Sequence, residues 1–147
     1  MRSDCFLDTN ILIYAAAGRE DEPEKYRISY DLVLTERFGI SGQVLAEFYV
    51  NIFRAAKVPP TLAEVDRWIE LLSLHPFTPV DISLVQTGVL LSRRFQISYW
   101  DAALVAAAER LGAPILYSED LNHGQSYGAV KVINPFADVV AASQQSR

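Results

Sequence analysis

Short β-type runs alternate with longer helix-type runs along this sequence, and this alternation restricts the fold more than any other feature. Parallel strands need long crossover connections, which helices of this length supply. The pattern therefore predicts an α/β fold with a central, mostly parallel five-stranded sheet flanked by helices. Strands are predicted at residues 5–7, 39–41, 77–80, 115–117 and 130–133. Helices are predicted at residues 11–17, 23–37, 42–56, 62–74, 82–95 and 99–111.

The length fits a single domain. A chain of 147 residues, half of them hydrophobic, can bury one core, and residues 1–147 contain no repeat or linker that would mark a second domain. A frayed tail is expected at about residues 141–147. The predicted helix at 99–111 contains the unbroken apolar run from Ala102 to Ala108, so we expect it to be buried on most faces.

Cysteine use and hydropathy bear on the compartment. Cys5 is the single cysteine, so the chain can form neither an intramolecular disulfide nor a cysteine-based metal site. The longest apolar run is far shorter than the ~20 residues that span a bilayer. We therefore expect a cytoplasmic protein that does not enter the membrane.

Four carboxylates are expected to meet at one edge of the sheet. Asp8 directly follows the first predicted strand, and Asp120 closely follows the fourth. Glu47 and Asp101 lie in the first turns of predicted helices. Strands of a right-handed parallel sheet end at one edge, and the helices that follow them begin there. The topology therefore predicts that these four acids converge.

Three of the four acids also have a plain structural interpretation. Asp8 is a candidate helix N-cap, as are its neighbours in the segment 8–10. Asp101 stands three residues after Ser98, which is the spacing of a capping box. The segment 118–120, which contains Asp120, is also typical of a turn.

Glu47 and Asp101 are harder to explain as structural residues. Glu47 flanks the apolar stripe of its helix, where an unpaired carboxylate is costly. Asp101 opens a helix that is predicted to be buried, and no arginine lies within a turn of it. A divalent cation would satisfy all four acids at once, and hard oxygen ligands suit Mg²⁺ or Mn²⁺.

Net charge bears on whether nucleic acid is a partner. The chain has 13 basic and 18 acidic residues, a formal charge of −5, which by itself argues against phosphate binding. Two bound divalent cations would offset four of those charges and attract phosphate to the same place. Net charge therefore excludes little.

Four segments together carry a family resemblance: residues 6–12 (FLDTNIL), 44–48 (VLAEF), 98–108 (SYWDAALVAAA) and 116–121 (LYSEDL). With these four segments in this order, the chain resembles the PIN-domain nucleases, and most closely the VapC-like toxins of toxin–antitoxin systems. The resemblance implies a PIN-like three-layer sandwich. It also implies a catalytic, metal-binding quartet at Asp8, Glu47, Asp101 and Asp120, with supporting roles for Thr9, Asn10 and Ser118.

The same resemblance implies an activity and its partners. The activity is RNA hydrolysis that depends on Mg²⁺ or Mn²⁺ and leaves a 5′-phosphate and a 3′-hydroxyl. Two metal ions about 4 Å apart can generate the nucleophile, relieve charge and stabilise the leaving oxygen. The partners are RNA, a cognate antitoxin and a second copy of the chain in a homodimer.

Several further residues were considered for RNA contact. Asn51 and Arg54 follow Glu47 at helical spacing, so we expect them on one ridge along the RNA path. His123, just past Asp120, is a turn residue by default and a phosphate contact in the alternative. For Tyr99 and Trp100, core packing is favoured over base stacking. His75 is expected at a helix end or on the surface.

Other functions remain as alternatives. A PIN fold that binds RNA or a protein without turnover would keep the same architecture. A phosphotransfer domain would need a lysine after its fifth strand, where this chain has Asn134, and haloacid-dehalogenase chemistry would need an aspartate in place of Asn10. A dinucleotide-binding role is disfavoured, because no Gly-x-Gly-x-x-Gly follows a strand.

Overall fold

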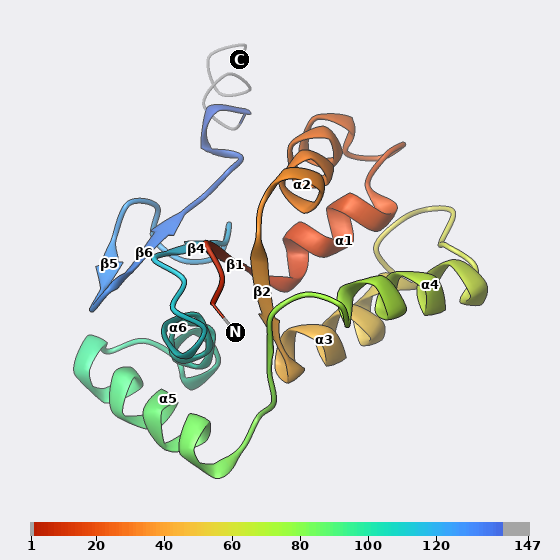
Figure 1. The fold of residues 1–147 in the computed structure, drawn as a ribbon. Coiled ribbons are helices and arrows are strands. Elements are labelled where there is room, and N and C mark those ends of the chain that lie inside the picture. Colours follow the sequence, from red (N-terminus) through yellow and green to blue (C-terminus); the bar gives the residue numbers. More distant parts are fainter. Residues whose placement is uncertain (1, 140–147) are drawn as a thin grey trace.

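The computed structural model describes residues 2–139, with six strands and six helices (Figure 1). The strands are β1 (Cys5–Leu7), β2 (Phe38–Ser41), β3 (Phe77–Thr78), β4 (Ile115–Tyr117), β5 (Ser126–Tyr127) and β6 (Val130–Ile133). The helices are α1 (Thr9–Ala17), α2 (Pro23–Thr35), α3 (Gly42–Ile52), α4 (Leu62–Leu72), α5 (Ile82–Phe95) and α6 (Tyr99–Arg110). The predicted tail at 141–147 lies outside the described residues.

The strands form one sheet in the order β3-β2-β1-β4-β6-β5. All neighbouring pairs are parallel except β5 and β6, which pair antiparallel. The predicted mostly parallel sheet is confirmed, but the predicted count of five strands is wrong, because β5 is a sixth. β5 is only two residues long and reaches β6 through a tight turn at Gly128, whose φ of 62° is in the left-handed region. Two residues are too few for any periodicity to predict.

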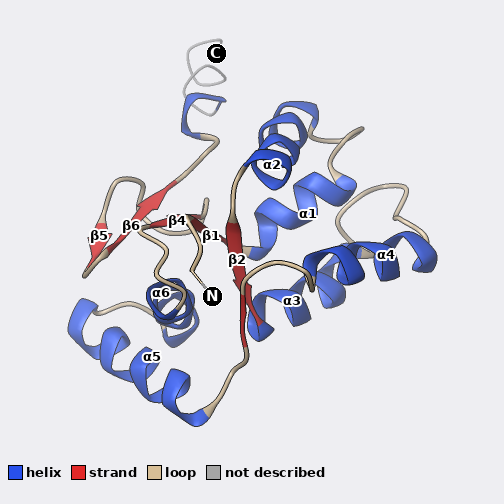
Figure 2. Ribbon diagram, in the orientation of Figure 1, coloured by secondary structure: helices blue, strands red, loops and turns tan. Residues whose placement is uncertain are grey.

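Helices cover both faces of the sheet (Figure 2). On one side α1 packs against α2 and α3, and on the other α5 packs along α6, which contacts β2, β4 and β6. The predicted α/β sandwich of helices around a central sheet is therefore confirmed. Within residues 2–139, none of the helices is both long and apolar enough to cross a membrane.

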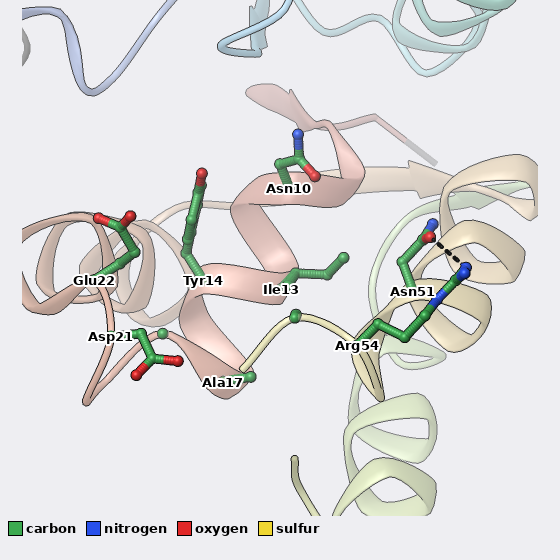
Figure 3. Close-up of a pocket in the computed structure, with 10 residues that line it drawn as sticks. Asn10, Ile13, Tyr14, Ala17, Asp21, Glu22, Asn51 and Arg54 are labelled. Carbon is green, nitrogen blue, oxygen red and sulfur yellow. Dashed lines mark hydrogen bonds between the residues drawn. The ribbon is translucent and has the colours of Figure 1, made fainter. Parts of the chain in front are cut away.

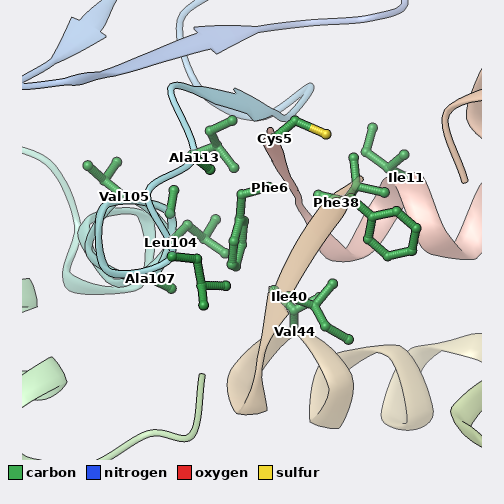
Figure 4. Packing of buried hydrophobic residues seen from close by; sticks show 14 of the residues in the cluster. Cys5, Phe6, Ile11, Phe38, Ile40, Val44, Leu104, Val105, Ala107 and Ala113 are labelled. Atoms are coloured by element: carbon green, nitrogen blue, oxygen red, sulfur yellow. The ribbon is translucent and has the colours of Figure 1, made fainter. Parts of the chain in front are cut away.

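The core lies on both faces of the central strands, against α6 on one side and against α1 and α3 on the other (Figure 4). Phe6 on β1 is fully buried, as are Phe38 and Ile40 on β2. Every residue from Ala102 to Ala108 is buried, as its unbroken apolar run predicts. Small side chains let α6 approach its neighbours closely: a Cβ added at Gly88 on α5 would meet the Tyr99 ring at 3.0 Å. This packing fixes the start of α6 near the sheet edge.

Several predicted boundaries differ from the observed ones. α3 ends at Ile52 rather than at residue 56, because its last turn tightens into bonds three residues apart, with the Arg54 N–H donating to the Asn51 carbonyl at 3.1 Å. β3 stops at Thr78 rather than at residue 80, since Pro79 has no N–H to donate to the sheet. α5, β4 and β6 have their predicted bounds.

His75 lies just past the end of α4, as the sequence predicts, where its N–H donates to the Leu72 carbonyl at 3.1 Å and the residue is half-buried. Its ring stacks on the buried Phe38 ring, with centroids 3.9 Å apart and planes inclined by 20°. Burial lowers the pKa of His75, which favours the neutral ring. The histidine is thus part of the packing beneath β2.

Candidate active site

Asp8 leaves the end of β1 in an extended conformation and is the N-cap of α1. Its side chain is buried, with 6% of the residue exposed. One carboxylate oxygen accepts the Thr9 N–H at 2.7 Å, and the other accepts the Ser118 hydroxyl at 2.8 Å. An N-cap usually accepts from a donor two or three residues ahead, and the bond to a residue 110 positions away is not a capping contact. Asp8 therefore caps a helix and also belongs to a tertiary cluster.

Ser118 connects Asp8 to Asp120. Its hydroxyl is fully buried at the end of β4, where it donates to Asp8 and accepts the Asp120 N–H at 3.2 Å. The Asn10 side-chain amide donates to the Asp120 carboxylate at 3.4 Å. β1 and β4 are adjacent and parallel, so the residues after them meet at one edge of the sheet. The two acids are neighbours, as the sheet topology predicts.

Glu47 faces the same edge from the second turn of α3. One of its carboxylate oxygens accepts the Thr9 hydroxyl at 3.0 Å, and the other accepts the Gln43 amide at 3.2 Å. Ser41, at the end of β2, caps α3 by accepting the Val44 N–H at 3.3 Å. The end of β2 thus sets where α3 begins, and the Thr9 hydroxyl links α3 to the start of α1.

Asp101 lies in the first turn of α6. Ser98 is the N-cap and accepts the Asp101 N–H at 3.1 Å, so the Ser98 half of the predicted capping box is present. The Asp101 carboxylate makes no hydrogen bond within residues 2–139, so the reciprocal contact of the capping box, from the Ser98 N–H to Asp101, is absent there. Burial raises the pKa values of Asp120 and Tyr127, and the negative charge of Asp101 adds to the rise in both, which places Asp101 within electrostatic reach of Asp120.

Burial and mutual repulsion perturb the ionisation of this edge. Burial, together with the charges of Asp120 and Glu47, raises the pKa of Asp8 to about 6, against the hydrogen bonds from Ser118 and Thr9, which lower it. The pKa of Asp120 is also raised, first by burial and then by the charges of Glu119, Asp101 and Glu47. Asp120 is thus the acid on which the charges of both Glu47 and Asp101 act, and Asp8 is affected by Asp120 and Glu47.

The donor set suits a hard divalent cation. Its groups are carboxylate oxygens, and no ion pair within residues 2–139 includes any of the four acids. A divalent cation is therefore a counter-charge that the chemistry of this set would fit. Among residues 2–139, no three Asp, Glu, His or Cys side chains lie close enough together to enclose an ion as they stand. The acids are gathered at one edge but not in a coordination geometry.

Glu119, the residue before Asp120, belongs to a charged group that the sequence did not predict. Glu119 accepts the Tyr14 hydroxyl at 2.6 Å and forms an ion pair with Lys25 at 3.0 Å. Lys25 also lies over the rings of Tyr14 and Phe136, at 5.1 and 5.4 Å from their centroids. Burial, together with Glu119, raises the pKa of Tyr14 to about 12, so its hydroxyl stays protonated and donates. No sequence pattern joins α1, α2 and the segment after β4 in this way.

The remaining candidate residues have mixed outcomes. The Asn51 amide donates to the Glu47 carbonyl at 2.9 Å, and Arg54 donates to the Asn51 side chain at 3.4 Å. Arg54 lies two residues beyond the end of α3, so the predicted helix through it is wrong, although its side chain still contacts Asn51. Its place along the RNA path stays a prediction. His123 accepts the Asn134 N–H at 3.0 Å and thereby joins two loops, which fits the turn role. Trp100 is 64% exposed, so its predicted core packing is wrong.

The fold and its acidic edge define an α/β protein whose carboxylates are gathered at the carboxyl ends of parallel strands. Residues 5–126 match the family model of the PIN domain. The chain therefore belongs to the PIN-domain family. Comparison with curated proteins gives no match.

Solved structures share the fold at low sequence identity. VapC20 of Mycobacterium tuberculosis, described as a sarcin–ricin loop cleaving toxin, is 18% identical over 85% of this chain and 93% of its own, with a TM-score of 0.63. A toxin–antitoxin complex from Klebsiella pneumoniae is 18% identical over 89% and 97%, with a TM-score of 0.64. VapBC2 of Rickettsia felis, bound to a promoter DNA fragment, is 18% identical over 87% and 96%, with a TM-score of 0.59.

Proposed function

We propose that this PIN-domain protein is a divalent-metal-dependent endoribonuclease and the toxin of a toxin–antitoxin pair. One observation carries the proposal: the buried Asp8 is tied through Ser118 to Asp120, beside Glu47, and none of these acids forms an ion pair within residues 2–139. Structural carboxylates with ordinary roles are usually paired or exposed. An uncompensated cluster at the carboxyl edge of a parallel sheet is where ligands bind.

The four acids have distinct roles in this proposal. Asp8 is the central metal ligand, because it is the most buried and has both oxygens oriented by hydrogen bonds. Asp101 and Asp120 are flanking ligands, and Glu47 coordinates directly or through water. Mg²⁺ or Mn²⁺ bound here supplies an activated water, charge relief at the phosphate and stabilisation of the leaving oxygen.

The supporting residues orient these acids. Ser118 and Thr9 fix the carboxylates of Asp8 and Glu47, and Asn10 fixes that of Asp120. Such outer contacts typically change metal affinity by about 10–100-fold when removed. Neither histidine is placed to act as the base, since His75 stacks on Phe38 past the end of α4 and His123 joins two loops.

The proposed substrate and partners follow from the family and its structural neighbours. Single-stranded RNA is the substrate, with Asn51 and Arg54 beside the acids as candidate contacts. The neighbouring structure from Klebsiella pneumoniae, described as a toxin–antitoxin complex, supports a cognate antitoxin as partner. A homodimer and a reducing, cytoplasmic location are part of the same proposal, and the buried Cys5, whose pKa burial raises to about 12, suits it as an unreactive thiol.

A second candidate is a PIN fold that binds RNA or a protein without cleaving it. The observation in its favour is that no three acids in residues 2–139 enclose an ion as they stand. A protein that binds without cleaving does not need its acids in a metal-coordinating arrangement. Metal dependence of cleavage distinguishes the two candidates.

The deciding experiment is cleavage of single-stranded RNA in Mn²⁺ or Mg²⁺, with excess EDTA as the metal-free arm. Cleavage should require metal, and a double variant, Asp8→Asn with Asp120→Asn, should lose at least about 100-fold in rate. Asp66→Asn removes the same charge from an exposed site on α4 and is the matched control. Undiminished cleavage by the double variant would refute the nuclease mechanism, and RNA binding without cleavage would favour the second candidate.

A further inference from the structure

Two residues of α1 contact the segment that carries Asp120. Asn10 and Tyr14 lie one helical turn apart with their polar ends projecting the same way, and both line a pocket that extends to Arg54 (Figure 3). The Asn10 amide donates to the Asp120 carboxylate at 3.4 Å, whereas the Tyr14 hydroxyl donates to Glu119 at 2.6 Å. α1 thus contacts two consecutive residues, and its contact with Glu119 is much the shorter.

Asp120 is weakly held by its own contacts. Within residues 2–139 its carboxylate accepts only the Asn10 amide, at a distance that is long for a hydrogen bond, and its N–H donates to Ser118 at 3.2 Å. The segment 119–121 follows the end of β4 and belongs to no helix or strand. Asp8, by contrast, has its two oxygens bound at 2.7 and 2.8 Å. The orientation of Asp120 therefore depends on its neighbours in the chain.

Glu119, the neighbour before Asp120, is held at both carboxylate oxygens. One accepts the Tyr14 hydroxyl, and the other forms the 3.0 Å ion pair with Lys25. The side chains of Lys25 and Glu119 are 20% and 17% exposed, so solvent screens this pair less than a surface pair. The Lys25 ammonium also lies over the rings of Tyr14 and Phe136, which themselves pack edge to face at 5.3 Å. These contacts fix the Glu119 side chain against the core.

Lys25 occupies an unfavourable place for a lysine. It lies in the first turn of α2, where the positive end of the helix dipole disfavours a cation. Its partner in an ion pair within residues 2–139 is Glu119, which is 94 positions away in the sequence. α2 carries none of the four acids, and Lys25 links its first turn to the acidic edge.

We propose that Lys25 and Tyr14 are positioning residues of the proposed metal site. They act through Glu119, whose fixed side chain orients Asp120. The proposal rests on the proposed nuclease function, in which Asp120 is a metal ligand. On the other side of Asp120 the buried Leu121 anchors the segment in the core, so the fold should survive the loss of the Glu119 contacts while the orientation of Asp120 does not. Outer contacts of this kind typically change metal affinity about 10–100-fold.

Two substitutions test the positioning, each with a matched control. Lys25→Met removes the ammonium and keeps a side chain of similar length, and Tyr14→Phe removes only the hydroxyl. Lys57→Met removes the same charge from an exposed residue, and Tyr30→Phe removes an exposed hydroxyl that makes no hydrogen bond within residues 2–139. Lys25→Arg is the conservative variant, because it keeps the charge and the donors.

The first measurement is Mn²⁺ binding by calorimetry, on variants whose near-UV circular dichroism matches that of the wild type. Charge alone predicts that Lys25→Met binds Mn²⁺ more tightly, because a cation near the acids has been removed. Lost positioning has the opposite sign, and both Lys25→Met and Tyr14→Phe should weaken binding at least about tenfold. Lys25→Arg should restore the affinity, and the two controls should match the wild type. Unchanged or tighter binding in both test variants would overturn the proposal.

The second measurement is the Mn²⁺ dependence of RNA cleavage. If Lys25 and Tyr14 only stabilise the fold, their variants contain less active protein but keep the wild-type half-saturating Mn²⁺ concentration. Positioning instead raises that concentration about tenfold or more. Metal-dependent cleavage with the same half-saturating concentration in the wild type and both variants refutes the positioning role and leaves the nuclease function standing.

The third measurement needs neither metal nor RNA. Backbone ¹⁵N order parameters at residues 119–121 should fall in both test variants from about 0.85, typical of a rigid backbone, toward about 0.6, and should stay at the wild-type level in the controls. Order parameters that fall in this way, in a protein that binds no Mn²⁺ even as the wild type, keep the attachment of Asp120 and refute the metal site. Order parameters unchanged in both variants, together with unchanged Mn²⁺ affinity, refute the attachment itself.

Discussion

Replacing Asp8 with asparagine separates a metal ligand from a helix cap, because the two roles predict opposite changes in metal-free stability. The folded protein raises the pKa of Asp8 from 3.8 to about 6. A raised pKa means that the folded state binds more protons than the unfolded chain between these two values. The free energy of unfolding therefore falls as pH rises through that window, and the loss is nearly complete by about pH 7.

The magnitude follows from the size of the rise. At 1.36 kcal/mol per pKa unit, the ionised Asp8 costs the metal-free fold about 3 kcal/mol at neutral pH. That figure is already net of the hydrogen bonds from Ser118 and Thr9, which hold the pKa of Asp8 down. Asparagine avoids the cost and can still accept the Thr9 N–H, but it has one oxygen instead of two, so the Ser118 hydroxyl loses its acceptor at about 1–2 kcal/mol. The variant should therefore be more stable by about 1–2 kcal/mol, or about 3–6 °C in Tm.

The assay is thermal unfolding in EDTA at pH 7.5 and pH 4, with Asp66→Asn as the control. The advantage of Asp8→Asn should be present at pH 7.5 and should shrink toward pH 4, where Asp8 is protonated in the folded wild type. Saturating Mn²⁺ should stabilise the wild type by about 2.7 kcal/mol at 100 times its Kd and should stabilise the variant far less. If Asp8→Asn is destabilised in EDTA and Mn²⁺ shifts neither protein, Asp8 is only a helix cap.

Three further substitutions test the surroundings of the acids. Ser118→Ala removes the hydroxyl between two acids and should weaken Mn²⁺ binding about 10–100-fold by calorimetry; unchanged affinity would make that contact structural only. Arg54→Ala should weaken RNA binding and lower its salt slope by about 1 in filter binding, with metal affinity intact, and an unchanged slope would remove Arg54 from the RNA path. Lys25→Met leaves Glu119 without its partner and should cost about 1–3 kcal/mol in urea unfolding, which an added Glu119→Gln should largely restore; no recovery would mean that the loss is one of packing.

The sequence alone was enough for the architecture and for the approximate position of the acids. Period and length of the apolar runs give the bounds of α5, β4 and β6, because those signals are local. A parallel sheet then sends its strand ends to one edge, so residues that follow strands must become neighbours. This rule brings Asp8 and Asp120 together without any knowledge of side chains.

Tertiary structure decided which atoms meet at that edge. Ser118 contacts Asp8 across 110 positions of sequence, and Lys25 reaches Glu119 across 94, and no local periodicity encodes such pairs. Only packing determines that Trp100 faces outward beside a buried run of alanines. The end of α3 at Ile52 likewise depends on a tightened last turn, and it moves Arg54 from a helical ridge to the wall of a pocket. Hydrophobic patterning determines which segments become helices and strands. Burial, hydrogen bonding and charge repulsion between distant segments determine the chemistry of the site.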